Sequence, residues 1–372
     1  MNTLHSRHAS KEHGFSVIEL MVAMTISLIL LAGVIQVFVA NKQTYRLNDG
    51  VSQVQENGRF AEAFIGQEVR SAGFLGCANT STVAFYNDVD PTKYSGSMDP
   101  FTTFSGVGGL KGHDNVTTSL PSTNDLVKMG ITVTADLASG STGDLLAGTD
   151  AIEIKKAGVC DGGNVVFTGL GSTFRYNDTA NIKIEDAAAC GLQQDSIVLV
   201  TDCATADMFA ITNNPLNAGA DFNTLAHASG NNLSSRLSGF YGPGSQVYNL
   251  YGAVLYIGKG ASGEPALFRR RLNTISTGYV TEELVEGVEN MQITYGQDTD
   301  GNHTPDYYVV ASSVTDWDKV IAARITLLLR SSDNNITQAS QTYSYNGATV
   351  TASDRRLRRV FTTTIALRNR LN

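Results

Sequence analysis

The chain is poor in the residues on which most catalytic and nucleic-acid-binding sites depend. Of its 372 residues only six are histidines, three of them within the first 13, so little material remains for a histidine-based catalytic or zinc site. Acidic residues outnumber basic ones and give a formal net charge of −8, which argues against a nucleic-acid binder that works by bulk charge. The sequence motifs of α/β-hydrolases, P-loop proteins and zinc proteases are missing as well. These absences argue against an enzyme.

Proline is also scarce, with seven residues against 36 glycines. Many glycine-containing turns and few rigid, proline-rich linkers favour a β-rich fold. The apolar share of 42% and the charged share of 17% exclude a disordered chain and a membrane protein with many spans. At about 150 residues per domain, the length allows one large domain or two modest ones.

One long apolar run is present, over residues 20–40, without a formal charge. As a helix it would be about 31 Å long, enough to cross a bilayer core of about 30 Å. No other stretch approaches this length, so the sequence predicts a single span. A secretory signal would place its small-residue cleavage site after the apolar core. Here a small residue, Gly14, stands directly before it.

A carboxylate, Glu19, lies near the start of this apolar run. Full insertion of such a group into a membrane costs about 2.5–3.5 kcal/mol. Glu19 therefore either stays at the headgroup level in contact with water or is neutralised by a partner. The residues alone leave both interpretations open.

The string GFSVIELMVAM, with Gly14, Phe15 and Glu19 ahead of the apolar helix, resembles the class III signal of type IV prepilins. The resemblance implies that a membrane-embedded prepilin peptidase removes residues 1–14 as a leader, cleaving between Gly14 and Phe15. It implies N-methylation of the new Phe15 amine, and pairing of Glu19 with a neighbouring subunit's N-terminal amine during assembly. Two opposite charges in a low-dielectric helix bundle relieve each other's desolvation, which agrees with that role.

The helical pattern continues beyond the apolar run. Small and apolar residues recur at steps of three and four, which is typical of one face of an α-helix. These positions are Leu47, Val51, Val54, Gly58, Ala61, Ile65 and Ala72. Charged side chains, Glu68 among them, lie between them, and Gly73 is a stop signal. We expect a helix from Phe15 to Ala72, about 87 Å long, apolar over 15–40 and amphipathic over 41–72.

Residues 73–372 are expected to form a β-rich globular head. Six segments have strand patterns, and they do not alternate with helices, which argues against a parallel nucleotide-binding sheet. The segments are 151–155, 196–201, 247–257, 266–271, 320–329 and 359–367. The predicted fold class is α+β and pilin-like, with the long N-terminal helix packed on a mainly antiparallel sheet. Residues 87–150 show no pattern that assigns their fold.

Stretches such as SAGFLGC, LVEGVENMQITYGQDTDGN and DKVIAARITLLLRS are similar to the PilW-type minor pilin family. The resemblance implies a minor pilin that helps to prime a type IV pilus used in twitching, within a complex of other minor pilins and the major pilin near the filament tip. A tip adhesin is a further implied partner. Before assembly the helix would cross the inner membrane once with the head in the periplasm, and afterwards the protein would be extracellular in the pilus.

Three other functions stay open. One is a J-type minor pseudopilin of type II secretion, and another is a tip protein that mainly binds DNA or surfaces. The third is a periplasmic protein with a simple single-span anchor.

Four cysteines, Cys77, Cys160, Cys190 and Cys203, give an even count in a head that would be exported, which fits two disulfides. Three pairings are open. Cys190 with Cys203 would close a short loop, whereas Cys77 with a head cysteine would tie the helix end to the sheet. No C-x-x-C occurs, so zinc or thioredoxin-like chemistry is not expected.

A candidate calcium loop places Asp298, Asp300, Asn302 and Asp306 at positions 1, 3, 5 and 9. The glycine stands at position 4 rather than 6, and position 12 lacks a carboxylate. The other interpretation is a polar turn stabilised by its own side chains. Calcium is the one cofactor that the sequence suggests.

Arginines are concentrated in two places. More than half of them are Arg269, Arg270, Arg271, Arg355, Arg356, Arg358, Arg359, Arg368 and Arg370. They could be solvated strand edges that resist edge-to-edge pairing, a docking surface for an acidic subunit, or contacts to DNA phosphates.

Overall fold

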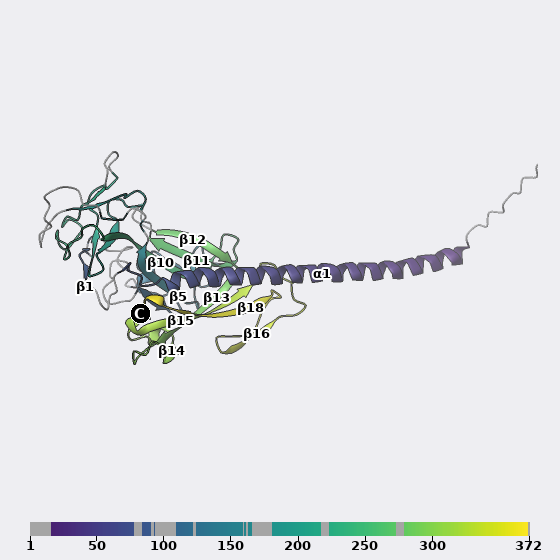
Figure 1. Ribbon diagram of the computed structural model, residues 1–372. Coiled ribbons are helices and arrows are strands. Elements are labelled where there is room, and N and C mark those ends of the chain that lie inside the picture. The colour runs from purple at the N-terminus through teal and green to yellow at the C-terminus, as the bar shows by residue number, and fades with distance from the viewer. Residues whose placement is uncertain are drawn as a thin grey trace, which may run out of the picture.

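One long helix projects from a β-rich head (Figure 1). The computed structural model describes residues 16–77, 84–90, 93, 109–121, 124–158, 160, 163–165, 181–216, 223–272 and 279–370. The helix, α1, runs over Val17–Arg70 and ends two residues before the predicted end. Gly73 follows with φ 72°, the left-handed conformation that glycine adopts without strain, which confirms it as the stop.

The two halves of α1 have different surroundings. Every residue from 16 to 42 is exposed, whereas burial against the head begins at Gly50. The predicted inner face is confirmed at Val54, Gly58, Ala61 and Ile65, which are buried in contact with the head. Leu47 was predicted on the same face but is 38% exposed, so burial of this face begins about one turn later than predicted, at Gly50.

The larger part of the head is a ten-stranded sheet built around one long central strand, β10 (Gln246–Lys259). The path along this sheet is β1-β8-β7-β10-β11-β12, and β5, β2, β4 and β3 join beside β10. The bounds are β1 Ala84–Asn87, β2 Leu110–His113, β3 Val133–Thr134, β4 Leu145–Leu146, β5 Ala151–Gly158, β7 Ile197–Thr201, β8 Thr205–Ala210, β11 Pro265–Leu272 and β12 Tyr279–Glu286. Over the described residues only β1 with β8 and β3 with β4 pair in parallel.

A second sheet has four antiparallel strands in the order β14-β13-β15-β18. Their bounds are β13 Val288–Gln297, β14 Tyr307–Val309, β15 Val320–Arg330 and β18 Arg358–Ala366. Short elements complete the described head: α3 Asp125–Lys128, η1 Ala311–Ser313, η2 Trp317–Lys319, η3 Arg368–Arg370, and the strand pairs β6 Ile182–Ile184 with β9 Asn223–Leu225 and β16 Thr342–Tyr345 with β17 Ala348–Thr351.

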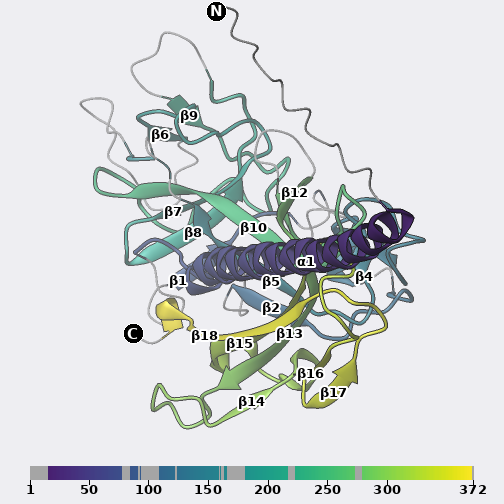
Figure 2. The ribbon, with the colours of Figure 1, turned by 90° about the vertical axis from the view of Figure 1, so that its right-hand side faces the viewer.

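The second half of α1 packs against both sheets. Figure 2 looks toward the exposed end of the helix and shows β7, β8 and β10 on one side of it and β13, β15 and β18 on the other. Ile65 of α1, Leu255 of β10 and Ile325 of β15 belong to one continuous apolar core. The helix and both sheets therefore share this core, which fixes the direction of the helix relative to the head.

The predicted fold class is confirmed, with a long apolar N-terminal helix and a mainly antiparallel head. All six predicted segments contain strands, namely β5, β7, β10, β11, β15 and β18. Within 87–150, where the sequence assigned nothing, the described residues form β2, β3, β4 and α3.

Candidate functional site

The first half of α1 is an exposed apolar rod. Val17 at one end and Phe38 near the other are both more than two-thirds exposed, and exposed apolar side chains occur on every side of the helix between them. By length and composition α1 is the one described helix that could cross a membrane. Monomeric soluble proteins rarely leave so large an apolar surface in water. The rod therefore requires lipid or other apolar helices around it.

Glu19 lies in the first turn of α1 and is exposed. The position suits a carboxylate, because the unpaired N–H groups at a helix N-terminus carry partial positive charge. Along the rod no other charge occurs before Lys42. Gly14 and Phe15 lie outside the described residues, so cleavage and N-methylation there stay predictions.

A loop between β15 and β16 contacts α1 where the rod meets the head. The side-chain amide of Gln43 donates to the carbonyl of Ile336 over 2.8 Å, and Arg46 lies 3.5 Å from a carboxylate oxygen of Asp333. Gln53 donates to the hydroxyl of Ser332 over 3.1 Å. We call residues 331–336 the collar. Its polar contacts with the helix start at Gln43, about two turns before burial begins at Gly50, and continue to Gln53.

Glu68, near the C-terminal end of α1, is the centre of a buried polar cluster. Its side chain is 9% exposed, and its two oxygens lie 2.8 Å from Nζ of Lys156 and 3.0 Å from a guanidinium nitrogen of Arg269. The hydroxyl of Tyr251 donates to it over 2.7 Å. Burial alone would raise the pKa of Glu68, but these hydrogen bonds and the charge of Lys156 outweigh it, so the pKa is lowered.

Glu68, which the sequence shows only as a charge between the apolar positions of the helix, is therefore buried against the head. Its partners come from β5, β10 and β11, at least 88 residues away in sequence. No local pattern could have indicated them. The cluster joins the end of α1 to three strands of the larger sheet.

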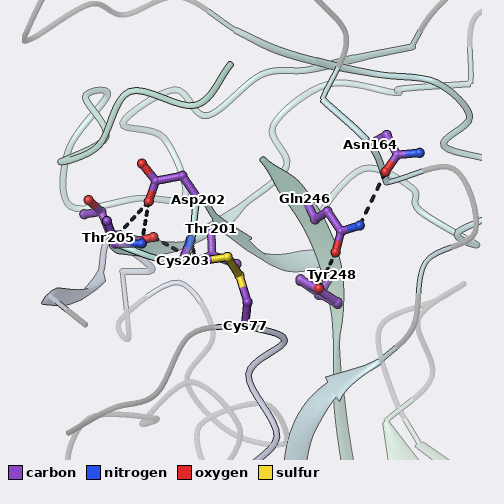
Figure 3. The surroundings of a disulfide bond; sticks show 9 residues. Cys77, Asn164, Thr201, Asp202, Cys203, Thr205, Gln246 and Tyr248 are labelled. Carbon is purple, nitrogen blue, oxygen red and sulfur yellow. Dashed lines mark hydrogen bonds between the residues drawn. A yellow bond between two sulfur atoms is a disulfide. The ribbon is translucent and has the colours of Figure 1, made fainter. Parts of the chain in front are cut away.

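The disulfides are Cys77–Cys203 and Cys160–Cys190. The short-loop pairing of Cys190 with Cys203 is therefore not formed, and a pairing of Cys77 with the head is. Figure 3 shows Cys77, seven residues after α1, bonded to Cys203 in the turn between β7 and β8. Asp202 shapes that turn by accepting hydrogen bonds from the N–H groups of Ala204 and Thr205. This disulfide links the chain just after the end of α1 to the β7–β8 turn of the larger sheet.

The predicted calcium loop brings its three carboxylates together. One oxygen each of Asp298, Asp300 and Asp306 lies within 4.8 Å of the others. The side-chain amide of Asn302 donates to a carboxylate oxygen of Asp300 over 2.9 Å, and its oxygen accepts from the N–H of Thr304.

The same loop is stabilised by its own hydrogen bonds, as the alternative interpretation expects. Asp298 accepts from the N–H groups of Gly301 and His303, and Asp306 accepts from the N–H of Thr299. Burial alone would raise the pKa of Asp298, but these hydrogen bonds together outweigh it, so its pKa is lowered. The hydrogen bonds from Thr299 likewise lower the pKa of Asp306. A bound calcium ion stays a prediction.

A second cluster of metal-ligand types, which the sequence analysis missed, is His113, Asp125 and Glu153. Glu153 is fully buried, and Nζ of Lys155 lies 3.1 Å from it. Lys111 forms an ion pair with Asp125. Both carboxylates thus have a lysine partner, and the cluster is balanced in charge without an ion.

Four of the nine concentrated arginines form ion pairs within the head. Arg269 and Arg271 pair with Glu282 of β12. Arg358 is 5% exposed and pairs with Glu289 and Asp354, and the remaining pairs are Arg356 with Glu264 and Asp354. Because Arg358 is buried, the interpretation of these arginines as a solvated strand edge does not hold for it.

These arginines therefore contribute little to a DNA-binding or docking surface, because acidic residues of the head already neutralise them. Arg359 and Arg368 differ from them, since both are exposed and pair with no carboxylate of the described chain.

Comparisons with known families agree with this geometry. Residues 9–35 match the model of the prokaryotic N-terminal methylation motif, and residues 254–369 match the model described as type IV pilus-assembly protein W, PilW. No curated protein and no solved structure gives a significant match.

A methylation motif, an exposed apolar N-terminal helix and an antiparallel head seated on its second half together define a type IV pilin-like protein. Within that class the chain is similar to PilW over residues 254–369, from the second half of β10 into η3. Both matched families are structural components of pili rather than enzymes.

Proposed function

We propose that this protein is a minor pilin that helps to prime and assemble a type IV pilus, in a tip complex with other minor pilins. The observation that carries the proposal is the exposed apolar half of α1, which adjoins a methylation motif and is attached firmly to a large head. An apolar helix with no partner inside its own chain fits first a membrane and then a bundle of equivalent helices.

The proposed sequence of events follows from the chemistry of the N-terminus. Prepilin peptidase cleaves between Gly14 and Phe15, and methylation follows at Phe15. While the helix lies in the inner membrane with the head in the periplasm, Glu19 stays near the headgroups. On extraction into the filament Glu19 pairs with the amine of a neighbouring subunit, because both charges would otherwise be desolvated without compensation.

The size of the head supports a position at the tip. Two sheets lie around the second half of α1, and the larger has ten strands. A head of this width is accommodated more easily once at the end of a thin filament than repeatedly along its shaft. A tip adhesin that rests on this head would be a further partner, and the major pilin would polymerise beneath the complex. No catalytic step is part of the proposal.

The test is a Glu19→Ala substitution in a strain that lacks the native copy. We expect normal removal of residues 1–14, measured by mass spectrometry of the mature N-terminus, but loss of the protein from sheared pili and far fewer pili per cell. Glu56→Gln, on the exposed side of α1, is the matched control and should assemble normally. If the Glu19→Ala protein enters pili and supports their growth like wild type, the proposal is wrong.

Deletion of the gene separates the proposal from the pseudopilin alternative. Loss of pili and of twitching supports the minor pilin, whereas loss of secreted enzymes with normal pili supports a type II secretion component. Gold labelling that is spread evenly along the pili would contradict the tip position.

A further inference from the structure

The four-stranded sheet ends in a long strand whose outer edge has no partner in the described chain. β18 pairs with β15 along its whole length, and no described strand pairs with its other side. The segment from Val360 to Leu367 contains no charged residue, proline or glycine. A strand edge of this kind is a ready template for pairing with another extended chain.

The register shows which backbone groups point outward. The N–H of Leu367 donates to the carbonyl of Ile321, so the odd-numbered residues of β18 exchange hydrogen bonds with β15. In an antiparallel pair the hydrogen-bonded positions alternate. The even-numbered residues therefore direct their N–H and C=O groups away from the sheet. They are Val360, Thr362, Thr364 and Ala366, and all four are exposed.

The start of the edge confirms this alternation. At Arg358, also an even position, the side chain of Gln341 takes the place of a neighbouring strand. Its oxygen accepts from the N–H of Arg358 and its amide donates to the carbonyl of Arg358, both over 2.8 Å. The side chain of Gln341 thus satisfies the outward backbone N–H and C=O groups of Arg358. Among the described residues, no group hydrogen-bonds to the outward backbone groups of the next four even-numbered positions.

The other long sheet edge in the described chain is protected. β12 carries a register shift in its pairing with β11 and has three glutamates, at 282, 283 and 286. The edge strand β14 has only three residues. Bulges, charges and short length are the devices that prevent edge pairing. β18 lacks all three between Val360 and Ala366.

We propose that the outer edge of β18 is a docking strand that receives an extended segment of another subunit of the pilus complex, with acidic residues at the two ends of that segment. The charge pattern identifies the partner. Arg359 and Arg368 flank the uncharged stretch, and both are exposed without a carboxylate partner among the described residues. The proposal rests on the proposed function, because it names a contact within the same complex.

A second copy of this chain fits the edge poorly. If two β18 edges paired antiparallel with their outward, even-numbered positions opposite each other and Thr364 at the centre, Arg368 of each copy would lie opposite Val360 of the other, one residue from its Arg359. A parallel arrangement would bring Arg359 within one position of its own counterpart. Like charges close to each other across a strand pair destabilise it. Repulsion between these arginines therefore disfavours a second copy of this chain and favours a different subunit that carries acidic residues.

The experiment compares the full-length protein alone with the protein co-produced with the other minor pilins and the major pilin of its organism, in a host without pili. Hydrogen–deuterium exchange is measured on both. Exchange at the amides of Thr362 and Thr364 should slow on the order of tenfold or more in the complex. Unchanged exchange in a complex that forms would overturn the proposal.

Two variants make the test specific. Thr364→Pro removes an outward N–H without removing a bond to β15, which proline tolerates at an edge, and Thr364→Ala keeps the N–H as the matched control. We expect co-purification of the partner to fall on the order of tenfold for the proline variant only, with both variants equally folded by circular dichroism. Arg359→Glu with Arg368→Glu should weaken it too, whereas the exposed Arg236→Glu should not.

Each outcome is distinguishable from failure of the proposed function. If the Thr364→Pro protein assembles and co-purifies like wild type while Glu19→Ala abolishes pili, the docking strand is wrong and the minor pilin stands. Protection of the outward amides in the protein alone, increasing with its concentration, would mean self-pairing and would also overturn the proposal. If the wild-type chain co-purifies with no pilin, both proposals fail.

Discussion

The backbone of Gly58 in α1 lies directly against the ring of Phe361 in β18. A Cβ atom at Gly58 would be 2.4 Å from Cζ of that ring, closer than any real contact. The helix can approach the four-stranded sheet this closely only because residue 58 has no side chain. Contact between the helix and the sheet therefore depends on this pair.

We expect Gly58→Ala to lower the free energy of unfolding by about 1–3 kcal/mol, because the ring of Phe361 must move from its packed position. Urea denaturation measures this. Gly66→Ala is the matched control, since it lies in the same helix with nothing within 4 Å of its Cβ position. It should be neutral or stabilising by up to about 1 kcal/mol, as alanine favours helix. Phe361→Leu should restore part of the loss in Gly58→Ala, and additive effects would contradict the contact.

Replacing Glu68 by glutamine should destabilise the protein by about 2–4 kcal/mol, because the substitution leaves the largely buried Lys156 without its carboxylate and Arg269 with Glu282 alone. Glu56→Gln, on the exposed side of the same helix, should change stability by less than about 0.5 kcal/mol. Equal effects of the two substitutions would show that the cluster does not hold the end of the helix.

The same pair of proteins gives a pH test. The pKa of Glu68 is lowered from its ordinary value of 4.5, so the folded state favours the ionised form. The contribution of a group with a lowered pKa is complete above its unfolded pKa and is lost as the pH falls through its folded pKa. The difference in unfolding free energy between wild type and Glu68→Gln should thus be constant at neutral pH and decrease below about pH 4.5. A difference that persists at pH 3 would indicate packing rather than charge.

The two disulfides should contribute unequally. Cys77–Cys203 spans 126 residues and Cys160–Cys190 spans 30, and a longer closed loop removes more entropy from the unfolded chain. We expect the double serine variant of the first pair to be less stable than that of the second by about 1 kcal/mol. Denaturation of both variants under non-reducing conditions tests this. The reverse order would mean that local packing around Cys160 outweighs loop length.

The calcium prediction has a direct test in the full-length protein in detergent. If Asp298, Asp300 and Asp306 hold the ion, millimolar Ca²⁺ raises the thermal midpoint of wild type, and Asp300→Ala removes that increase. Mg²⁺ serves as the control, because it prefers six ligands in a stricter geometry. No change in wild type would leave the loop as a turn stabilised by Asp298 and Asp306 alone.

Sequence reasoning succeeded where the determining interactions are local. The helix follows from an uninterrupted apolar run and then from residues such as Val54 and Ile65 at helical spacing, and its end follows from Gly73. The strand at 320–329 is recognisable because it is almost wholly apolar. A nearly continuous apolar run identifies a buried strand without any knowledge of its neighbours.

It did not succeed where distant segments meet. Nothing near Glu68 indicates Arg269, 201 residues away, and nothing near Cys77 selects Cys203 among three cysteines. The arginines at 355–359 looked like a charged surface because their partners, such as Glu289, come from other strands. Burial of a charge is decided by tertiary pairing, which local sequence does not encode.

The attachment of α1 to the head has a mechanical consequence. Polar contacts between α1 and the collar begin at Gln43, burial against the head follows from Gly50, and the covalent Cys77–Cys203 link lies beyond Arg70. Tension along the rod would act parallel to this whole length, so it would load all the contacts together in shear instead of peeling them apart one after another. The junction between head and rod is thus expected to resist a tensile force along the filament.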